Sequence, residues 1–178
     1  PEATARVLDA EGWFDTGDLG QLLADGSLVL TGRAKDTIVL SSGENIEPGP
    51  LEDCLVACTL VEQVMLVGHD RKSLGALVVP RLEALQEYAR ELGLVVPGGV
   101  PDGSPVGADA ALLKAFASRL NRRLAARPGA RGEERLAGVA LVEPFSIDNG
   151  LLTQTLKQRR DRIAARDAAA IEALYAGR

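Results

Sequence analysis

Two tight turns near the amino terminus constrain the fold of this chain more than any other feature. Asp25-Gly26 stands between the apolar runs 19–23 and 27–31, which is a strong hairpin signal because glycine accepts a positive φ. A second turn, Ser41-Ser42-Gly43-Glu44, follows the strand-like run 37–40, and its glycine would let the backbone approach another molecule closely. The sequence therefore predicts two hairpins in succession.

The rest of the chain alternates between helix and strand signals. Helical spacing of apolar residues predicts helices over 50–59, 82–92 and 156–175, and a fourth that Asp109 caps, with the apolar stripe Leu112, Leu113, Phe116, Leu120 and Leu124. Short β-branched runs predict antiparallel strands over 64–67 and 74–79 and a further strand over 139–142. The Pro- and Gly-rich stretch 97–107 is interpreted as an inserted loop, and 144–149 as an irregular connector. The pattern predicts an α+β domain with a small, mostly antiparallel sheet, N-terminal hairpins and flanking helices.

Composition narrows the class of protein. Apolar residues make up 46% of the 178 residues, enough for a core, and aromatic residues only 3%, so that core must be aliphatic. The net charge of −5 disfavours nonspecific binding to nucleic acid. No signal peptide or membrane-length apolar span is visible, which favours a cytoplasmic location, free or peripheral to a membrane. The start at Pro1 suits a piece of a longer chain.

The two cysteines and the single histidine do not form a metal-binding pattern. Cys54 and Cys58 fall on one helix face, and no second Cys or His pair supplies further ligands, so buried structural thiols are expected and no metal site. The single histidine, His69, follows an apolar run and is expected at a strand end or turn, where a catalytic role is the minor alternative.

Ordered motifs connect the two ends of the chain. They are Gly12-Trp13-Phe14-Asp15-Thr16-Gly17-Asp18, Gly32-Arg33-Ala34-Lys35-Asp36, Gly43-Glu44-Asn45-Ile46-Glu47-Pro48 and Leu152-Thr153-Gln154-Thr155-Leu156-Lys157. In this order they resemble the C-terminal part of adenylate-forming enzymes, the superfamily of acyl-CoA synthetases, luciferases and peptide synthetases. Segments 32–48, 74–80 and 145–157 are similar to the branch of long-chain acyl-CoA and acyl-carrier-protein synthetases.

The resemblance implies a two-step ligase and a chain that is only part of it. A fatty acid and ATP would give acyl-adenylate and pyrophosphate, and a pantetheine thiol of CoA or acyl carrier protein would then displace AMP. The family's Ser/Thr/Gly-rich loop for the ATP triphosphate belongs to a large N-terminal domain, which would also bind most of the Mg²⁺, and no such run occurs here. Residues 1–34 would be the end of that domain and 35–178 a mobile lid. The fragment alone is expected to be inactive.

Two residues are expected at the nucleotide. A carboxylate held by a tight turn can accept hydrogen bonds from both ribose hydroxyls, and the resemblance gives this role to Asp18; the alternative is an ordinary turn aspartate. Arg33 can present a planar fork to phosphate or ribose oxygens, and the resemblance places it against the nucleotide; the alternative is a surface ion pair. Trp13 is expected to pack in the core.

Three residues are expected to act in the movement of the lid and in thioester formation. The resemblance places Lys35 at the hinge, where a few backbone torsions turn the whole lid. It places Gly43 and Glu44 in the loop that enters the active site for thioester formation and borders the pantetheine tunnel. A glycine required only for the turn geometry explains Gly43 equally well.

Lys157 is the predicted catalytic residue. Joining a carboxylate to an α-phosphate brings two anions together, and a compact cation that touches both stabilises the transition state. The usual family motif is Thr-x-x-Gly-Lys, and the sequence departs from it because Leu156 replaces the glycine. The alternative places Lys157 on the solvated face of a basic helix with Arg159, Arg160 and Arg162, and these arginines are a candidate dock for an acidic carrier protein or the phosphates of CoA.

Two other functions remain open from the sequence. The chain could be a stand-alone module that binds a carrier protein or regulates a partner, which a search of the upstream gene for the missing ATP loop would decide. It could also belong to an aryl or short-chain acid ligase, which activity across chain lengths would decide. Oligomeric state is open.

Overall fold

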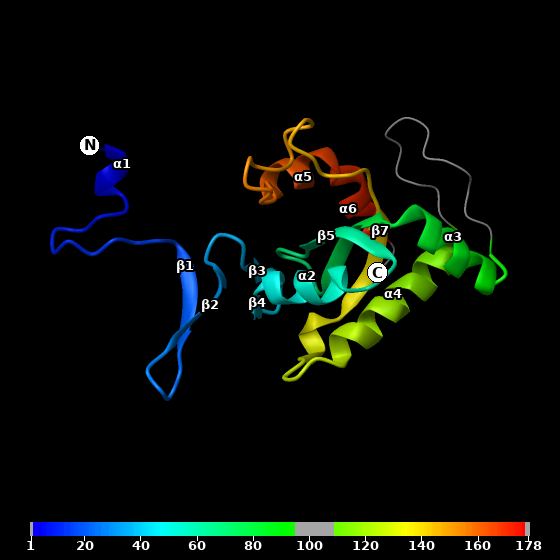
Figure 1. Cartoon of the computed structure of the whole chain (residues 1–178), viewed down its shortest axis with the longest axis horizontal. Coiled ribbons are helices and arrows are strands. Elements are labelled where there is room, and N and C mark those ends of the chain that lie inside the picture. The colour runs from blue at the N-terminus through cyan, green and yellow to red at the C-terminus, as the bar shows by residue number, and fades with distance from the viewer. Residues whose placement is uncertain (1, 95–108, 177–178) are drawn as a thin grey trace.

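A three-stranded sheet forms the centre of the chain in the computed structural model, which describes residues 2–94 and 109–176 (Figure 1). Its strand order is β5-β6-β7, antiparallel between β5 and β6 and parallel between β6 and β7. In chain order the elements are α1 (Glu2–Ala5), β1 (Asp18–Leu22), β2 (Leu28–Arg33), β3 (Ile38–Val39), β4 (Asn45–Ile46), α2 (Pro48–Val56), β5 (Val61–Val67), β6 (Leu74–Pro80), α3 (Leu82–Glu91), α4 (Ala110–Ala125), a 3₁₀ turn (Gly132–Glu134), β7 (Leu136–Leu141), α5 (Arg160–Arg166) and α6 (Ala168–Tyr175). The α+β prediction is confirmed. The predicted loop at 97–107 lies outside the described residues.

One face of the sheet packs against α2, α3 and α4. Successive side chains of a strand point to opposite faces, so Val64 and Val78 share this side. There they join Leu55, Leu85 and Phe116, one from each helix, in the main core. Asp109 caps α4, as predicted, by accepting a hydrogen bond from the Ala111 amide at 2.8 Å.

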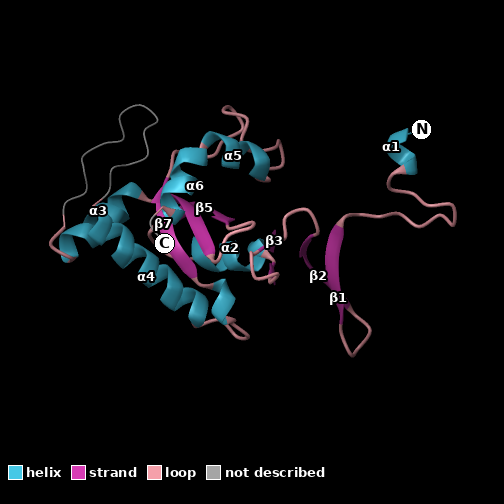
Figure 2. Cartoon of the chain, turned by 180° about the vertical axis from the view of Figure 1, so that it is seen from behind, coloured by secondary structure: helices cyan, strands magenta, loops and turns pink. Residues whose placement is uncertain are grey.

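The other face packs against α5 and α6 (Figure 2). Met65 and Leu77 alternate with the residues of the main core and meet Ile163 and Leu174 on this side. Gly75 permits the close packing, because a Cβ there would lie 2.9 Å from the Leu174 Cδ1. None of the helices in the described part of the chain is long and apolar enough to cross a bilayer.

The predicted helix over 156–175 is wrong at its start and its middle. Leu156 has a φ of +60°, which a right-handed helix cannot contain, and α5 begins only at Arg160. The predicted helix is also interrupted at Asp167, which lies between the end of α5 at Arg166 and the start of α6 at Ala168. Leu156 fits the helical spacing of apolar residues, but this spacing carries no information on the backbone torsion.

Both predicted hairpins are present, although the first one has no core. β1 pairs with β2 around Gly26, whose φ is +84°, and β3 pairs with β4 around Gly43, whose φ is +86°. Figure 1 shows that the chain up to β2 extends away from the sheet. Trp13 was expected in the core and is 74% exposed, so that prediction is wrong. The reason is that Trp13 lies in the segment before Ile38, from which neither core cluster of the described chain takes a residue.

Candidate functional site

Asp18 and Arg33 form one site at the base of the first hairpin. The strand register places them opposite each other, and the Arg33 Nε lies 3.1 Å from the Asp18 Oδ1. Arg33 also donates to the Thr16 carbonyl at 3.0 Å, which fixes the guanidinium beside the turn. The side chains remain 34% exposed for Asp18 and 53% for Arg33, so the Asp18 carboxylate can still accept from a hydroxyl and the Arg33 guanidinium can still donate to a hydroxyl or a phosphate oxygen. The sequence predicted these residues separately, and the fold brings them together.

Lys35 follows in a turn between the two hairpins. The turn is closed by the Asp36 amide, which donates to the Arg33 carbonyl at 2.9 Å, and Lys35 itself is exposed. It lines a groove of about 790 Å³ together with residues that come after Lys157 in the sequence, among them Arg159 and Arg162. Cations dominate this groove, which is also lined by His69, Arg71 and Arg160 and contains the acids Asp36 and Asp161. His69 follows the end of β5, as expected.

Gly43 and Glu44 lie in the exposed turn of the second hairpin. The Gly43 amide donates to the Leu40 carbonyl at 2.8 Å, and the positive φ of Gly43 shows that the turn geometry requires glycine or strain. A Cβ on Gly43 would meet no described atom within 4 Å, so nothing in this part of the chain crowds the position. Glu44 faces Arg131 at 3.7 Å.

Lys157 is exposed at the end of a small closed turn. Thr153 and Lys157 are joined twice, because the Thr153 amide donates to the Lys157 carbonyl at 2.8 Å and the Lys157 amide donates to the Thr153 Oγ1 at 3.0 Å. Leu152 and Gln158 pair beyond them. No ion pair within residues 2–94 and 109–176 involves Lys157. The alternative that placed Lys157 on the face of a basic helix is wrong, since α5 begins after it.

Leu156, the residue that departs from the usual motif, adopts a backbone conformation that favours glycine. Its φ of +60° lies in the left-handed region, where a side chain costs about 1–2 kcal/mol. Its side chain is 68% exposed and gains little from packing. A glycine at this position would therefore fit the observed turn without strain.

The sequence did not reveal that Glu52 and Arg160 support the segment after Lys157. Arg160 donates to both carboxylate oxygens of Glu52, at 2.9 and 3.1 Å, and to the Leu66 carbonyl at 2.7 Å. The Leu66 amide donates back to Glu52 at 2.7 Å. Burial raises the pKa of Glu52, and the charge of Arg160 opposes that rise. A signal was available, because Glu52 follows Pro48 by one helical turn on the buried side of α2.

A second unpredicted pair supports the turn at Gly43. Glu134 is buried, pairs with Arg127 and accepts hydrogen bonds from the Arg131 amide at 3.1 Å and its Nε at 3.2 Å. Arg131 in turn donates to the Asn45 carbonyl at 3.0 Å. Burial works against ionisation of Glu134, but the hydrogen bonds from Arg131 and the charges of Arg127 and Arg131 lower its pKa overall.

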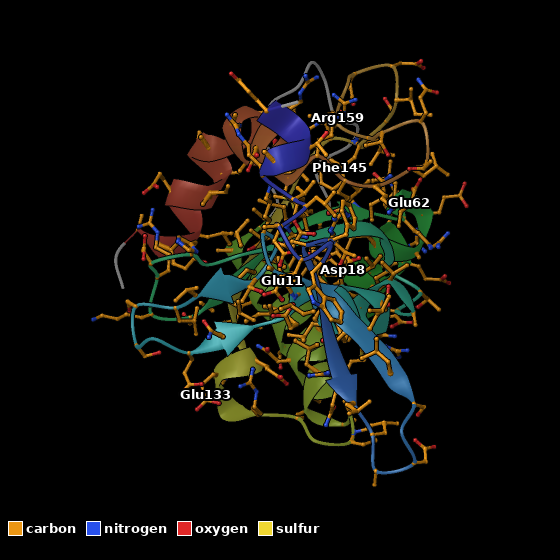
Figure 3. The ribbon with its side chains drawn as sticks, turned by 90° about the vertical axis from the view of Figure 1, so that its left-hand side faces the viewer. Glu11, Asp18, Glu62, Glu133, Phe145 and Arg159 are labelled. Atoms are coloured by element: carbon orange, nitrogen blue, oxygen red, sulfur yellow. The ribbon has the colours of Figure 1, made fainter. Side chains whose placement is uncertain are left out.

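The predicted site residues do not form one cluster in this structure. No hydrogen bond or ion pair among the described residues joins Lys157 to Asp18 or Arg33. In Figure 3, Asp18 lies at the start of the blue hairpin and Arg159 lies beside the orange and brown C-terminal segment. Cys58 is buried and Cys54 half-buried, both as free thiols, and no group of three or more His, Cys, Asp or Glu in the described chain is placed to hold a metal ion.

Comparison with known families identifies residues 35–94 of the chain. Residues 35–94 match the family model of the AMP-binding enzyme C-terminal domain. This segment of the chain belongs to that family. The match begins at Lys35, the residue at which the resemblance placed the hinge.

Curated relatives and solved structures extend the match beyond the AMP-binding enzyme C-terminal domain. Acyl-activating enzyme 16 of Arabidopsis thaliana is 37% identical over 98% of this chain and 24% of its own length. The long-chain-fatty-acid–[acyl-carrier-protein] ligase AEE15 of the same plant is 34% identical over 98% of the chain and 23% of its own length. The adenylation domain of a carboxylic acid reductase from Segniliparus rugosus, solved with AMP and a co-purified carboxylic acid, is 31% identical with a TM-score of 0.81, over 99% of this chain and 25% of that one. The chain thus spans about a quarter of the length of these curated relatives.

Proposed function

We propose that the chain is the C-terminal part of an AMP-forming ligase that activates a fatty acid as acyl-adenylate and transfers the acyl group to a pantetheine thiol. The observation that carries the proposal is the fixed turn that presents Lys157 to solvent without an ion-pair partner in the described chain. The relatives support the reaction class, since acyl-activating enzymes and fatty acid ligases match over 98% of the chain.

Asp18 and Arg33 would bind the nucleotide. The Asp18 carboxylate can accept from two ribose hydroxyls, and the Arg33 guanidinium, already fixed by Thr16, can donate to neighbouring oxygens. The donor set fits a nucleotide because an exposed acceptor and an exposed bidentate donor lie side by side. The solved relative with bound AMP supports this choice of ligand.

Lys157 would act in adenylation and the Gly43 turn in thioester formation. One cleft cannot hold a pyrophosphate leaving group and a thiol on the same path, so the lid would present two faces in turn by rotation about Lys35. The separation of Lys157 from the Asp18–Arg33 pair in this structure supports a lid that must move before all of them act together. Lys157 would then place a point charge between the carboxylate and the α-phosphate, where charge develops in the transition state.

The acid is proposed to be a long-chain fatty acid and the acceptor either CoA or acyl carrier protein. The support is the similarity to long-chain ligases of both acceptor types, at 34% identity for AEE15 and 35% for long-chain-fatty-acid–CoA ligase 1 of Cavia porcellus. ATP and Mg²⁺ would be bound mainly by residues outside this chain. An intact enzyme assayed with acids from acetate to palmitate, and with CoA and acyl carrier protein, tests both points; a preference for aryl or short-chain acids would contradict the first.

The test of the central role is Lys157→Ala in the complete protein, assayed in separate half-reactions. ATP–pyrophosphate exchange should fall by about 10²-fold to 10³-fold, because the variant removes a charge that acts in the transition state. Thioester formation from supplied acyl-adenylate should stay within about twofold of wild type by the same reasoning. Lys114→Ala is the matched control, since Lys114 is exposed on α4 and away from the turn. Normal pyrophosphate exchange in Lys157→Ala would refute the assignment.

A further inference from the structure

Two clamps of arginine and glutamate hold the two loops to which the proposed function assigns different half-reactions. The first clamp, Glu52 with Arg160, lies directly after the Lys157 turn. The second clamp, Glu134 with Arg131, contacts the Gly43 turn. The inference rests on the proposed function and extends it to residues that touch neither substrate nor cofactor.

The first clamp covers the open edge of the sheet. β5 is an edge strand, so its outward amides and carbonyls have no neighbouring strand. The Leu66 amide and carbonyl are satisfied by Glu52 and Arg160, and the Val64 carbonyl accepts from the Gln158 side chain at 2.8 Å. The segment that leaves Lys157 is therefore attached to β5 by side chains at two successive outward positions.

This attachment fixes the position of the Lys157 backbone. Only Gln158 and Arg159 separate Lys157 from Arg160, and the Arg159 amide also donates to the Leu151 carbonyl at 2.8 Å. With both ends of the turn held, its backbone has little freedom to carry the Lys157 ammonium away from one position. A displacement of about 1 Å in a reacting group can cost about a hundredfold in rate, so the clamp matters for catalysis without any contact with the substrate.

The second clamp fixes the other loop by similar chemistry. Arg131 donates to the Asn45 carbonyl at 3.0 Å and faces Glu44 at 3.7 Å, and Glu134 holds the Arg131 Nε at 3.2 Å. Arg127 completes the pairing of Glu134 from the end of α4. Figure 3 separates the two clamps, because Glu133, next to Glu134, lies at the lower side of the molecule and Arg159, next to Arg160, at the upper side.

We propose that Glu52 and Glu134 are positioning residues that act on different half-reactions: Glu52, through Arg160, places Lys157 for adenylation, and Glu134, through Arg131, places the Gly43 turn for thioester formation. No ion pair of the described chain joins one clamp to the other, so their effects are expected to be independent. Within the described chain neither glutamate forms an ion pair with Asp18 or Arg33, so neither needs to affect nucleotide binding directly.

The experiment compares Glu52→Gln and Glu134→Gln in the complete protein, with both half-reactions measured for each. Glu52→Gln should lower pyrophosphate exchange by about tenfold to a hundredfold and leave thioester formation from supplied acyl-adenylate within about twofold. Glu134→Gln should lower thioester formation from supplied acyl-adenylate by about tenfold to a hundredfold and leave pyrophosphate exchange within about twofold. Glu172→Gln is the control, because it removes the same charge from the exposed pair with Arg71 and should change neither half-reaction.

Arg160→Lys provides a second variant that keeps the charge. Lysine cannot reproduce the guanidinium fork that bridges Glu52 and the Leu66 carbonyl. Arg160→Lys should therefore lower pyrophosphate exchange and spare thioester formation, as Glu52→Gln does. Each half-reaction serves as the internal standard of the other, because partial unfolding lowers both rates equally and cannot produce a selective loss of one. Equal loss of both half-reactions, or no loss in either, in Glu52→Gln overturns the inference. If Lys157→Ala loses exchange while Glu52→Gln does not, the proposed function stands and only the clamp fails.

Discussion

The first hairpin and the sheet behind it use the same kinds of side chain in opposite ways. In β1 and β2, Leu22, Leu28 and Leu30 are between 65% and 72% exposed. In β6 and α4, leucines such as Leu77 and Leu120 are completely buried. The difference teaches that residues 35–94 and 109–176 contain their own hydrophobic core, whereas the described segment up to residue 34 contributes no buried core residue and exposes apolar side chains. Exposed apolar side chains that gather in one segment are typical of an interaction face.

The largest expected effect comes from matched leucine truncations on the two sides of this comparison. Leu120→Ala should lower the free energy of unfolding of the chain by about 2–5 kcal/mol, because the side chain is fully buried against the sheet. Leu30→Ala should change it by less than about 0.5 kcal/mol, since the side chain is 65% exposed. Urea denaturation of the isolated chain measures both values.

The same pair in the complete protein sharpens the comparison. The resemblance implies that residues 1–34 are the end of a larger N-terminal domain, and if that domain covers the hairpin, Leu30→Ala should there become destabilising by about 1–3 kcal/mol. An unchanged stability in the complete protein would contradict the docking role of the hairpin.

A smaller effect on stability is expected to distinguish the exposed Asp18–Arg33 pair of the hairpin from the pair that the buried Glu134 forms with Arg127. Glu134→Gln should lower the free energy of unfolding by about 1–3 kcal/mol at neutral pH, because the buried Glu134 carboxylate is the charged acceptor for donors of Arg127 and Arg131. Asp18→Asn should cost less than about 1 kcal/mol, since its partner Arg33 is exposed.

The pH dependence of the two variants separates them further. The pKa of Glu134 is lower in the folded chain than its ordinary value of 4.5, so its contribution is present above that pH and is lost as the pH falls through the folded pKa. The stability difference between wild type and Glu134→Gln should therefore shrink on acidification from pH 7 to about pH 3. Thermal unfolding across this range measures it, and a difference that grows instead would contradict the assigned shift.

The smallest effect concerns one turn from each region. Gly26→Ala in the first hairpin should destabilise the chain by about 1 kcal/mol, because the φ of +84° is unfavourable for any side chain. Leu156→Gly should stabilise it, by no more than about 1 kcal/mol, because glycine accepts the φ of +60° but also gains freedom in the unfolded state. Denaturation of both variants provides the test, with Leu156→Ala as a control that keeps the strain and removes the exposed side chain. A destabilised Leu156→Gly would show that the leucine contributes packing.

Much of the fold was predictable because it depends on local patterns. The Asp-Gly turn, the cap at Asp109 and the β-branched runs each specify local geometry directly. The predicted helix at 156–175 failed because Leu156 fits the helical period while its torsion is set by hydrogen bonds to Thr153. The exposure of Trp13 was not predictable either, because exposure depends on which other parts of the fold surround a segment.

The candidate site was predictable in its residues but not in its support. Asp18, Arg33 and Lys157 were found from motif order, and only the strand register reveals that the first two pair. Glu52 pairs with an arginine 108 positions away, and the Arg131 that pairs with Glu134 reaches the Asn45 carbonyl 86 positions away, so these contacts are known only once the fold is known.

The central claim is that the Lys157 ammonium enters the active site and contacts the reacting oxygens. A structure of the complete protein with a non-reactive acyl-adenylate mimic tests it most directly, with the lid captured in each orientation that it adopts. The account predicts that in one orientation the Lys157 Nζ lies within hydrogen-bond distance, about 3 Å, of the carbonyl oxygen and of the group that replaces the phosphate. A Lys157 amine that remains in bulk water in every orientation would contradict the account.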